Sequence, residues 1–352
     1  MPPLHLLLAS LFFLPGQSLA RCLQLEYLYT LDPGSSGPIQ LYGTVFGFVS
    51  SLILFRGTGS HTSERKNNYI PSSVSLCGSF LLAFSSLIIN SLGLPGQQVE
   101  FVILNTCLIQ STTITSAAGM LIGSSSLNRK PLDFQLLQGS LIAGGVSAGA
   151  VAATKIQPWG AACLGIGTGV LVVLAGTHVE PLISKKLGVP ISYYTFSVHG
   201  LPALLGGLVA ILMASLAEEK QGAIPYGFDL YELYPGRSYP LGQSSPGCEH
   251  VNKTKEEIFI CPTGTEEISL SLPHLPLLGR SAFDQAAWQA VALALSIGLG
   301  TIFGVIGGLV GCFLDRLGGH GMPREAWYDS TCFLETSGFN LSPVLRSNTE
   351  DE

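Results

Sequence analysis

Hydrophobic residues in this chain gather in long runs, and polar or charged residues are concentrated in the gaps between the runs. A helix that crosses a bilayer needs about 20 mostly apolar residues, and about seven runs after the amino-terminal segment have that character. They extend over Pro38 to Phe55, Ser73 to Leu94, Glu100 to Gly123, Phe134 to Ala153, Pro158 to Thr177, Tyr194 to Ala217 and Ala286 to Leu314. The pattern predicts an all-α polytopic membrane protein with about seven full transmembrane helices.

Composition agrees with this prediction. Charged residues make up 11% of the chain, hydrophobic residues 47%, and mean hydropathy is +0.44, whereas a soluble domain carries about 25% charged residues. Many Gly, Ser and Thr residues interrupt the runs, and such small residues let membrane helices approach closely. We therefore expect helix packing, more than lipid contact, to determine these segments.

The basic residues predict how the helices are oriented. They fall in every second gap, whereas the short alternate gaps carry only Lys155. The residues in question are Arg56, Arg65, Lys66, Arg129, Lys130, Lys185, Lys186, Arg316 and Arg324. By the positive-inside rule these gaps and the carboxyl tail, residues 336–352, are cytoplasmic. The protein is expected in the plasma membrane.

The long gap from Glu218 to Phe283 must then face outward, and we call it the outer excursion. It contains Cys248 and Cys261, and it carries the sequon Asn252-Lys253-Thr254. A disulfide and N-glycosylation both require the oxidising side of the membrane, so these residues agree with the orientation. We predict a bridge between the two cysteines, with two unpaired thiols in a flexible loop as the alternative. The cysteines within the apolar runs, Cys77, Cys107, Cys163 and Cys312, are expected to be small core residues.

The first twenty residues have two interpretations. Leu6 to Leu14 is a short apolar core, and Gln17-Ser18-Leu19-Ala20 before Arg21 is similar to a signal-peptidase site, although the usual basic start is missing. Cleavage is slightly favoured. The alternative is a short anchor that enters from the cytoplasm. Both interpretations leave residues 21–37 outside.

A single histidine, His199, stands early in a strongly apolar run and is followed by Gly200-Leu201-Pro202. Holding an ionisable side chain at membrane depth is costly, which points to a substrate path. The alternative is a core histidine bonded to a neighbouring helix. His178, near a helix end before Glu180, fits an interfacial or pairing role better than a catalytic one.

Several motifs occur in an order that resembles the Rh glycoproteins of the ammonium transporter (Amt/Rh) family. The match begins with DPGSSGPIQLYGTVFGF from Asp32 and holds to about Glu335, so that residues 21–335 form an Rh/Amt-like membrane domain. The other motifs are Asn105-Thr106, Pro131-Leu132-Asp133 with Gln138, LIAGGVSAG from Leu141, Gln157-Pro158-Trp159-Gly160, VHGLPALLGG from Val198, Gly279-Arg280-Ser281 and Tyr328-Asp329. No single motif is convincing, but the collinear series is.

The resemblance implies trimers in which each subunit has its own narrow apolar pore, formed between two inverted five-helix repeats. It also implies a transport route. Ammonium is recruited at the outer mouth and loses a proton, and neutral ammonia then passes a pair of pore histidines. Neutral ammonia needs only a few hydrogen-bonding partners, whereas an ion in a dry pore pays a large desolvation cost. The implied partners are ammonium or ammonia, the lipid bilayer, and copies of this chain or other Rh proteins.

Four residues fall on positions that matter in the family. His199 falls on the second of the paired histidines, whereas Gln40 stands at the position of the first. Glutamine can donate and accept hydrogen bonds but cannot take up a proton, so this pair has one titratable imidazole where the resemblance implies two. Leu108 takes the site of a gating aromatic residue, and Asp32 is a vestibule group or a plain helix cap.

The resemblance also implies that most of the first inverted repeat is missing, which raises a second hypothesis. The chain would then be a non-conducting Rh-like protein that assembles with full-length relatives. A receptor is the third choice, and it lacks Asp-Arg-Tyr and Asn-Pro-x-x-Tyr motifs. The sequence has no phosphate-binding Gly-rich loop with a Lys and no zinc spacing, so we expect no enzyme, no cofactor and no nucleic-acid partner.

Overall fold

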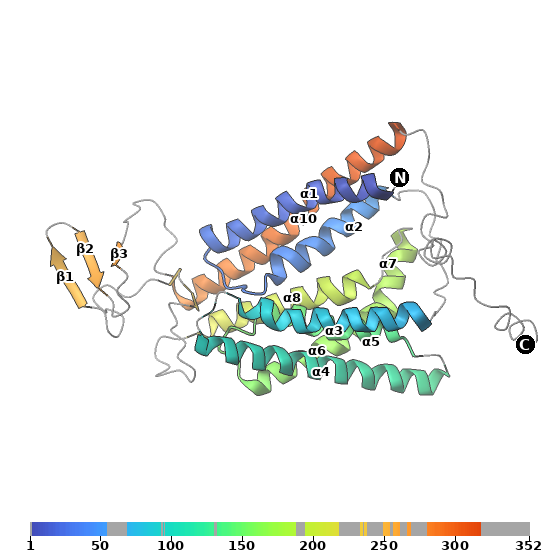
Figure 1. Ribbon diagram of the computed structural model, residues 1–352, viewed down its shortest axis with the longest axis horizontal. Coiled ribbons are helices and arrows are strands. Elements are labelled where there is room, and N and C mark those ends of the chain that lie inside the picture. The colour runs from blue at the N-terminus through green and yellow to red at the C-terminus, as the bar shows by residue number, and fades with distance from the viewer. Residues whose placement is uncertain are drawn as a thin grey trace, which may run out of the picture.

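A computed structural model describes the membrane part of the chain as a bundle of long helices (Figure 1). The described residues are 2–54, 69–92, 94, 96–129, 132–187, 194–217, 233–234, 236–237, 249–253, 256–260, 266–268 and 280–317. The α-helices are α1 Pro2–Cys22, α2 Tyr42–Leu54, α3 Tyr69–Ser91, α4 Gly96–Asn128, α5 Phe134–Gly149, α6 Pro158–Leu174, α7 Glu180–Leu187, α8 Leu201–Ser215 and α10 Ala282–Leu317. Four π-helical segments join them: η1 Leu23–Tyr27, η2 Ser36–Leu41, η3 Ala175–Val179 and η4 Phe196–Gly200. The predicted all-α membrane fold is confirmed.

Within the described residues, six helical stretches are long and apolar enough to cross a membrane. The run from Phe134 to Ala153 is the exception among the seven predicted, because α5 ends at Gly149 after 16 residues. It ends inside the bundle, where neighbouring groups bond its last carbonyls. Ser36 Oγ donates to Val146 O at 2.6 Å, and the Gly34 amide donates to Gly149 O at 3.0 Å. A helix is able to stop at membrane depth only where protein groups satisfy its free backbone atoms.

Helices α4 and α6 approach each other closely along a line of glycines. A Cβ atom on Gly165 would lie 2.4 Å from Ile109 O, and one on Gly169 would lie 2.3 Å from Thr113 O. Ser116 Oγ also donates to Ile166 O across this contact, at 3.3 Å. The expectation that small residues serve helix packing therefore holds here.

Helix α10 packs against α2 in the same way, with α1 beside both (Figure 1). A Cβ on Gly300 would lie 2.9 Å from Tyr42 O. The ring of Phe13 in α1 lies 5.4 Å from the Tyr42 ring and 5.5 Å from the Phe46 ring. These contacts place α1 against the bundle; whether the segment is a cleaved leader or an anchor stays a prediction.

The outer excursion contains a small antiparallel sheet that the sequence analysis did not predict. Strand β1 Glu249–Lys253 pairs with β2 Glu256–Ile260, which pairs with β3 Glu266–Ile268. Figure 1 shows the sheet beyond the end of the bundle where α10 begins, and the start of α1 at the opposite end. Asn252 lies in β1 opposite Glu257, whereas Cys248 and Cys261 lie outside the described residues.

The expectation that the cysteines of the apolar runs are core residues was wrong for three of them. Cys77, Cys107 and Cys163 are exposed on the bundle surface, and Cys312 is half-buried. The lipid-facing side and the core-facing side of a membrane helix are both apolar. The position of a small residue in an apolar run therefore does not show that the residue is buried.

The α4–α6 contact makes a direct prediction about Gly165. Replacing it with Ala places a methyl group against the backbone of α4, so we expect a loss of about 1–3 kcal/mol in the free energy of unfolding. A Cβ atom on Gly167, in the same helix, would have no neighbour within 4 Å, so Gly167→Ala is the matched control. Thermal unfolding in detergent measures both variants. Equal melting temperatures for Gly165→Ala and Gly167→Ala would contradict the packing described.

Candidate functional site

Two π-helical segments form the centre of the candidate site, and each is anchored by a carboxylate. Asp32 anchors η2, because its Oδ1 accepts from the Ser36 amide at 2.9 Å and its Oδ2 accepts from the Gly37 amide at 2.7 Å. Glu180 anchors η4, because its Oε1 accepts from the Ser197 amide at 2.7 Å and from Ser197 Oγ at 3.0 Å. Buried backbone N–H groups at the start of both segments thus bond carboxyl oxygens.

The two segments bring His199 and Gln40 together, although 159 positions separate them in the chain. His199 Nδ1 lies 2.8 Å from Gln40 Oε1, within hydrogen-bond distance. Both side chains are half-buried. The structure therefore pairs the two residues that fall on the paired-histidine positions of the resemblance.

A glycine next to the histidine permits this approach. A Cβ on Gly200 would lie 2.6 Å from Thr44 Cγ2, so η4 reaches α2 only because residue 200 has no side chain. Thr44 Oγ1 donates to the carbonyl of Gln40 at 2.9 Å. The backbone on both sides of the His199–Gln40 pair is therefore held by close contacts.

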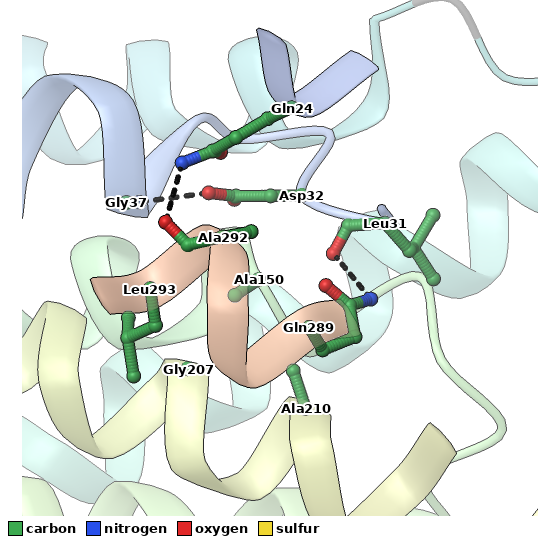
Figure 2. Close-up of a pocket in the computed structure, with 10 residues that line it drawn as sticks. All are labelled: Gln24, Leu31, Asp32, Gly37, Ala150, Gly207, Ala210, Gln289, Ala292 and Leu293. Atoms are coloured by element: carbon green, nitrogen blue, oxygen red, sulfur yellow. Dashed lines mark hydrogen bonds between the residues drawn. The ribbon is translucent and has the colours of Figure 1, made fainter. Parts of the chain in front are cut away.

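Asp32 also lines a small cavity, together with Gly37 of η2 (Figure 2). The cavity has a volume of about 20 Å³, which is room for about one water molecule. Its walls come from Gln24, Leu31, Asp32, Gly37, Ala150, Gly207, Ala210, Gln289, Ala292 and Leu293. Neither Gln40 nor His199 lines it, so the structure does not bring Asp32 and the polar pair into one cavity.

Two glutamines fix the walls of this cavity. Gln24 Nε2 donates to Ala292 O at 2.9 Å and to Ser296 Oγ at 2.7 Å, and Gln289 Nε2 donates to Leu31 O at 3.2 Å. Burial raises the pKa of the Asp32 carboxyl to about 6, against the opposing effects of the Gly37 and Ser36 amides and of Arg21. Asp32 is thus a helix-start residue that also faces the cavity.

The other predicted site residues lie elsewhere. Leu108 is half-buried in α4 and packs against a cluster of apolar residues that includes Val102, Ile109 and Ala210. No described hydrogen bond or core cluster joins it to His199. Sequence reasoning did not identify Glu180 as a site residue; the signal available to it was an acidic residue within a long apolar stretch.

Comparison with known proteins identifies the family. Residues 8–243 match the model of the Ammonium Transporter Family. The chain belongs to this family. Its members are transporters and channels rather than enzymes, which confirms both the resemblance and the expectation that this protein is not an enzyme.

Relatives of known name show how much of the chain is shared. It is 29% identical to the ammonium transporter Rh type C of Bos taurus over 354 residues, and 25% identical to the ammonium transporter Rh type B of Oryzias latipes over 356 residues. These matches cover 98% and 99% of this chain, but 66% and 65% of the relatives. The chain therefore spans about two thirds of the length of these two proteins, and 49% of the Rh type C of Oryctolagus cuniculus.

Solved structures confirm the Amt/Rh fold. The Rh50 structure from Nitrosomonas europaea, described as a member of the Rhesus protein family of channels, superposes with a TM-score of 0.61 at 18% identity. That match covers 97% of this chain and 73% of Rh50. Mep2 from Saccharomyces cerevisiae superposes with a TM-score of 0.50 at 16% identity, over 79% of this chain and 51% of Mep2.

The raised pKa of Asp32 predicts a specific pH dependence of stability. Its folded-state pKa, about 6, lies above the ordinary value of 3.8, so its contribution is fully present below pH 3.8 and is lost as the pH rises through 6. Acidification from pH 7.5 to 5 should therefore stabilise the protein through this group by about 1 kcal/mol.

The Asp32→Asn variant tests this, because it cannot titrate. We expect melting temperatures in detergent to lose this pH-dependent component, with the difference between variant and native protein changing around pH 6. Asp284→Asn, which removes an exposed carboxylate at the start of α10, serves as the control. Parallel pH profiles for native and Asp32→Asn proteins would overturn the assignment.

Proposed function

We propose that this chain is an Rh-type ammonium or ammonia channel or transporter subunit. Membership in the Ammonium Transporter Family supports the proposal, as do the activities for which the Rh type B and Rh type C relatives are named. The single observation that carries it is the His199–Gln40 hydrogen bond inside an apolar bundle. By the resemblance, these two residues fall on the positions of the family's paired histidines, and their contact supports the proposal.

The chemistry of the pair suits a small solute that forms hydrogen bonds. Ammonia carries three N–H donors and one lone pair. An imidazole and an amide offer both acceptors and donors, so they complement it. A charged ammonium ion would lose its hydration shell in such surroundings at a high cost. We infer that neutral ammonia passes the pair. Ammonium loses its proton at one end of the path, and ammonia takes up a proton at the other end.

A second candidate is a non-conducting Rh-like protein that assembles with full-length relatives. Gln40 favours it, because an amide removes one of two titratable groups, and Leu108 favours it, because a leucine replaces a gating aromatic ring. Co-expression with a tagged full-length Rh relative tests this candidate. Failure of the two chains to co-purify would count against it.

The assembly and topology of the protein belong to the same proposal. We infer trimers, as homotrimers or with other Rh proteins, in the plasma membrane and with the carboxyl tail in the cytoplasm. Residues 21–335 form the transmembrane domain, and the segment before them is a cleaved leader or a short anchor. The outer excursion carries a glycan at Asn252 and a disulfide between Cys248 and Cys261. Leu108 is proposed to line the pore together with His199 and Gln40.

The His199→Ala variant tests the channel hypothesis. We expect ammonia permeability of vesicles carrying the purified protein to fall about five- to hundredfold, because a hydrogen-bond partner worth about 1–3 kcal/mol is removed. His178→Ala is the matched control, since His178 also lies in a π-helical segment but is exposed and bonds Thr177. Permeability of the native protein no greater than that of empty vesicles would reject conduction by this chain alone.

The proposed orientation predicts a glycan on the outer excursion. Treatment of the protein from mammalian cells with an N-glycosidase should increase its electrophoretic mobility by one glycan. Asn252→Gln and Thr254→Ala should each abolish the shift, because both destroy the sequon. A mobility that none of these treatments changes, in protein shown to reach the cell surface, would argue that the excursion faces the cytoplasm.

A further inference from the structure

The contact between His199 and Gln40 restricts where the proton of the imidazole ring resides. The nearest atoms are His199 Nδ1 and Gln40 Oε1, 2.8 Å apart. An amide oxygen only accepts hydrogen bonds, so Nδ1 must carry the hydrogen for this contact to be favourable. A neutral imidazole has one ring hydrogen, and Nε2 is then a bare acceptor.

We propose that Gln40 is a positioning residue that fixes His199 in the Nδ1-protonated tautomer, with Nε2 left to accept an N–H bond from the passing solute. The part that concerns the solute rests on the proposed function. The part that concerns the tautomer does not, because it follows from the side-chain contact alone. The solute class is a small hydrogen-bond donor, for which ammonia or ammonium is the proposed case.

Glutamine differs in this respect from a second histidine. In a pair of neutral imidazoles either ring is able to hold the bridging hydrogen, so two arrangements exist and the outward-facing nitrogen of each ring changes between donor and acceptor. The Gln40 amide turns its oxygen toward the ring, and in that orientation a single arrangement remains. Gln40 therefore gives the pair a fixed direction: His199 donates to Gln40 and presents an acceptor on its other side.

The backbone supports this arrangement on both sides. Glu180 Oε1 accepts from the amide and hydroxyl of Ser197, two residues before His199. The contact between Gly200 and Thr44 sets the distance from η4 to α2, and Thr44 Oγ1 bonds the Gln40 carbonyl. The ring and the amide are thus presented from two held segments, which lowers the entropy cost of keeping their contact.

Nitrogen NMR of the protein in bilayers, with ring-labelled histidine, tests the tautomer directly. A protonated ring nitrogen and a bare one give well-separated signals, and subtraction of the His199→Asn spectrum identifies the His199 signals. At pH 8 we expect a protonated Nδ1 and a bare Nε2 in the native protein. A native spectrum with a protonated Nε2 and a bare Nδ1 would overturn the proposal.

Variants at position 40 separate positioning from general packing. Gln40→Leu removes the acceptor at similar size, and the ratio of Nδ1- to Nε2-protonated forms should fall about fivefold or more, the factor that one net hydrogen bond corresponds to. Gln40→Glu keeps an oxygen acceptor and should retain the proton on Nδ1. Gln157→Leu, at an exposed glutamine whose side chain does not cap α6, should leave the ratio unchanged.

The outcomes distinguish this inference from the proposed function. A native-like ratio in Gln40→Leu would refute the positioning role, whether or not the protein conducts. The predicted tautomer and its loss in Gln40→Leu, in a protein without ammonia permeability, would support the positioning role and reject the channel. Permeability should fall in Gln40→Leu more than in Gln157→Leu if both hold.

Discussion

The constraint on which this structure depends is that backbone N–H and C=O groups freed inside an apolar bundle must find protein partners, because lipid offers none. The helices of this chain are interrupted inside the bundle, and side chains of Asp32, Glu180 and Ser36 bond backbone groups at three of these interruptions. Asp32 accepts from the amides that begin η2, and Glu180 accepts from the amide of Ser197 that begins η4. Ser36 Oγ donates to a carbonyl near the end of α5.

These anchors explain why two polar side chains distant in sequence come to share a hydrogen bond. A π-helical turn is less favourable than an α-helical turn, and π-helical turns are often found at functional sites. Here η2 carries Gln40 and η4 carries His199, and each is followed directly by an apolar α-helix. A Cβ on Gly200 would meet Thr44, so this glycine lets η4 approach α2, the helix that directly follows η2. Close packing of these segments therefore brings the two polar side chains into contact.

Much of this was predictable from sequence. Long apolar runs predict the membrane helices because the hydropathy and length of a run are properties of consecutive residues. The motif series by itself singles out His199 and Gln40. The early end of α5 was not predictable, because it depends on partners such as Ser36 that come from distant segments. The exposure of Cys77 was not predictable either, since a lipid-facing surface and a core use the same apolar residues. The strands of the outer excursion lacked a clear alternating pattern.

The central claim is that His199 and Gln40 act as one unit in a solute path. A double-mutant cycle on ammonia permeability, with His199→Ala, Gln40→Ala and the combined variant at equal verified insertion, measures that coupling directly. The account predicts that the second substitution adds little once the first has been made, so that the combined loss is well below the sum of the logarithmic losses. Strictly additive losses would contradict it, as would two single variants that conduct like the native protein.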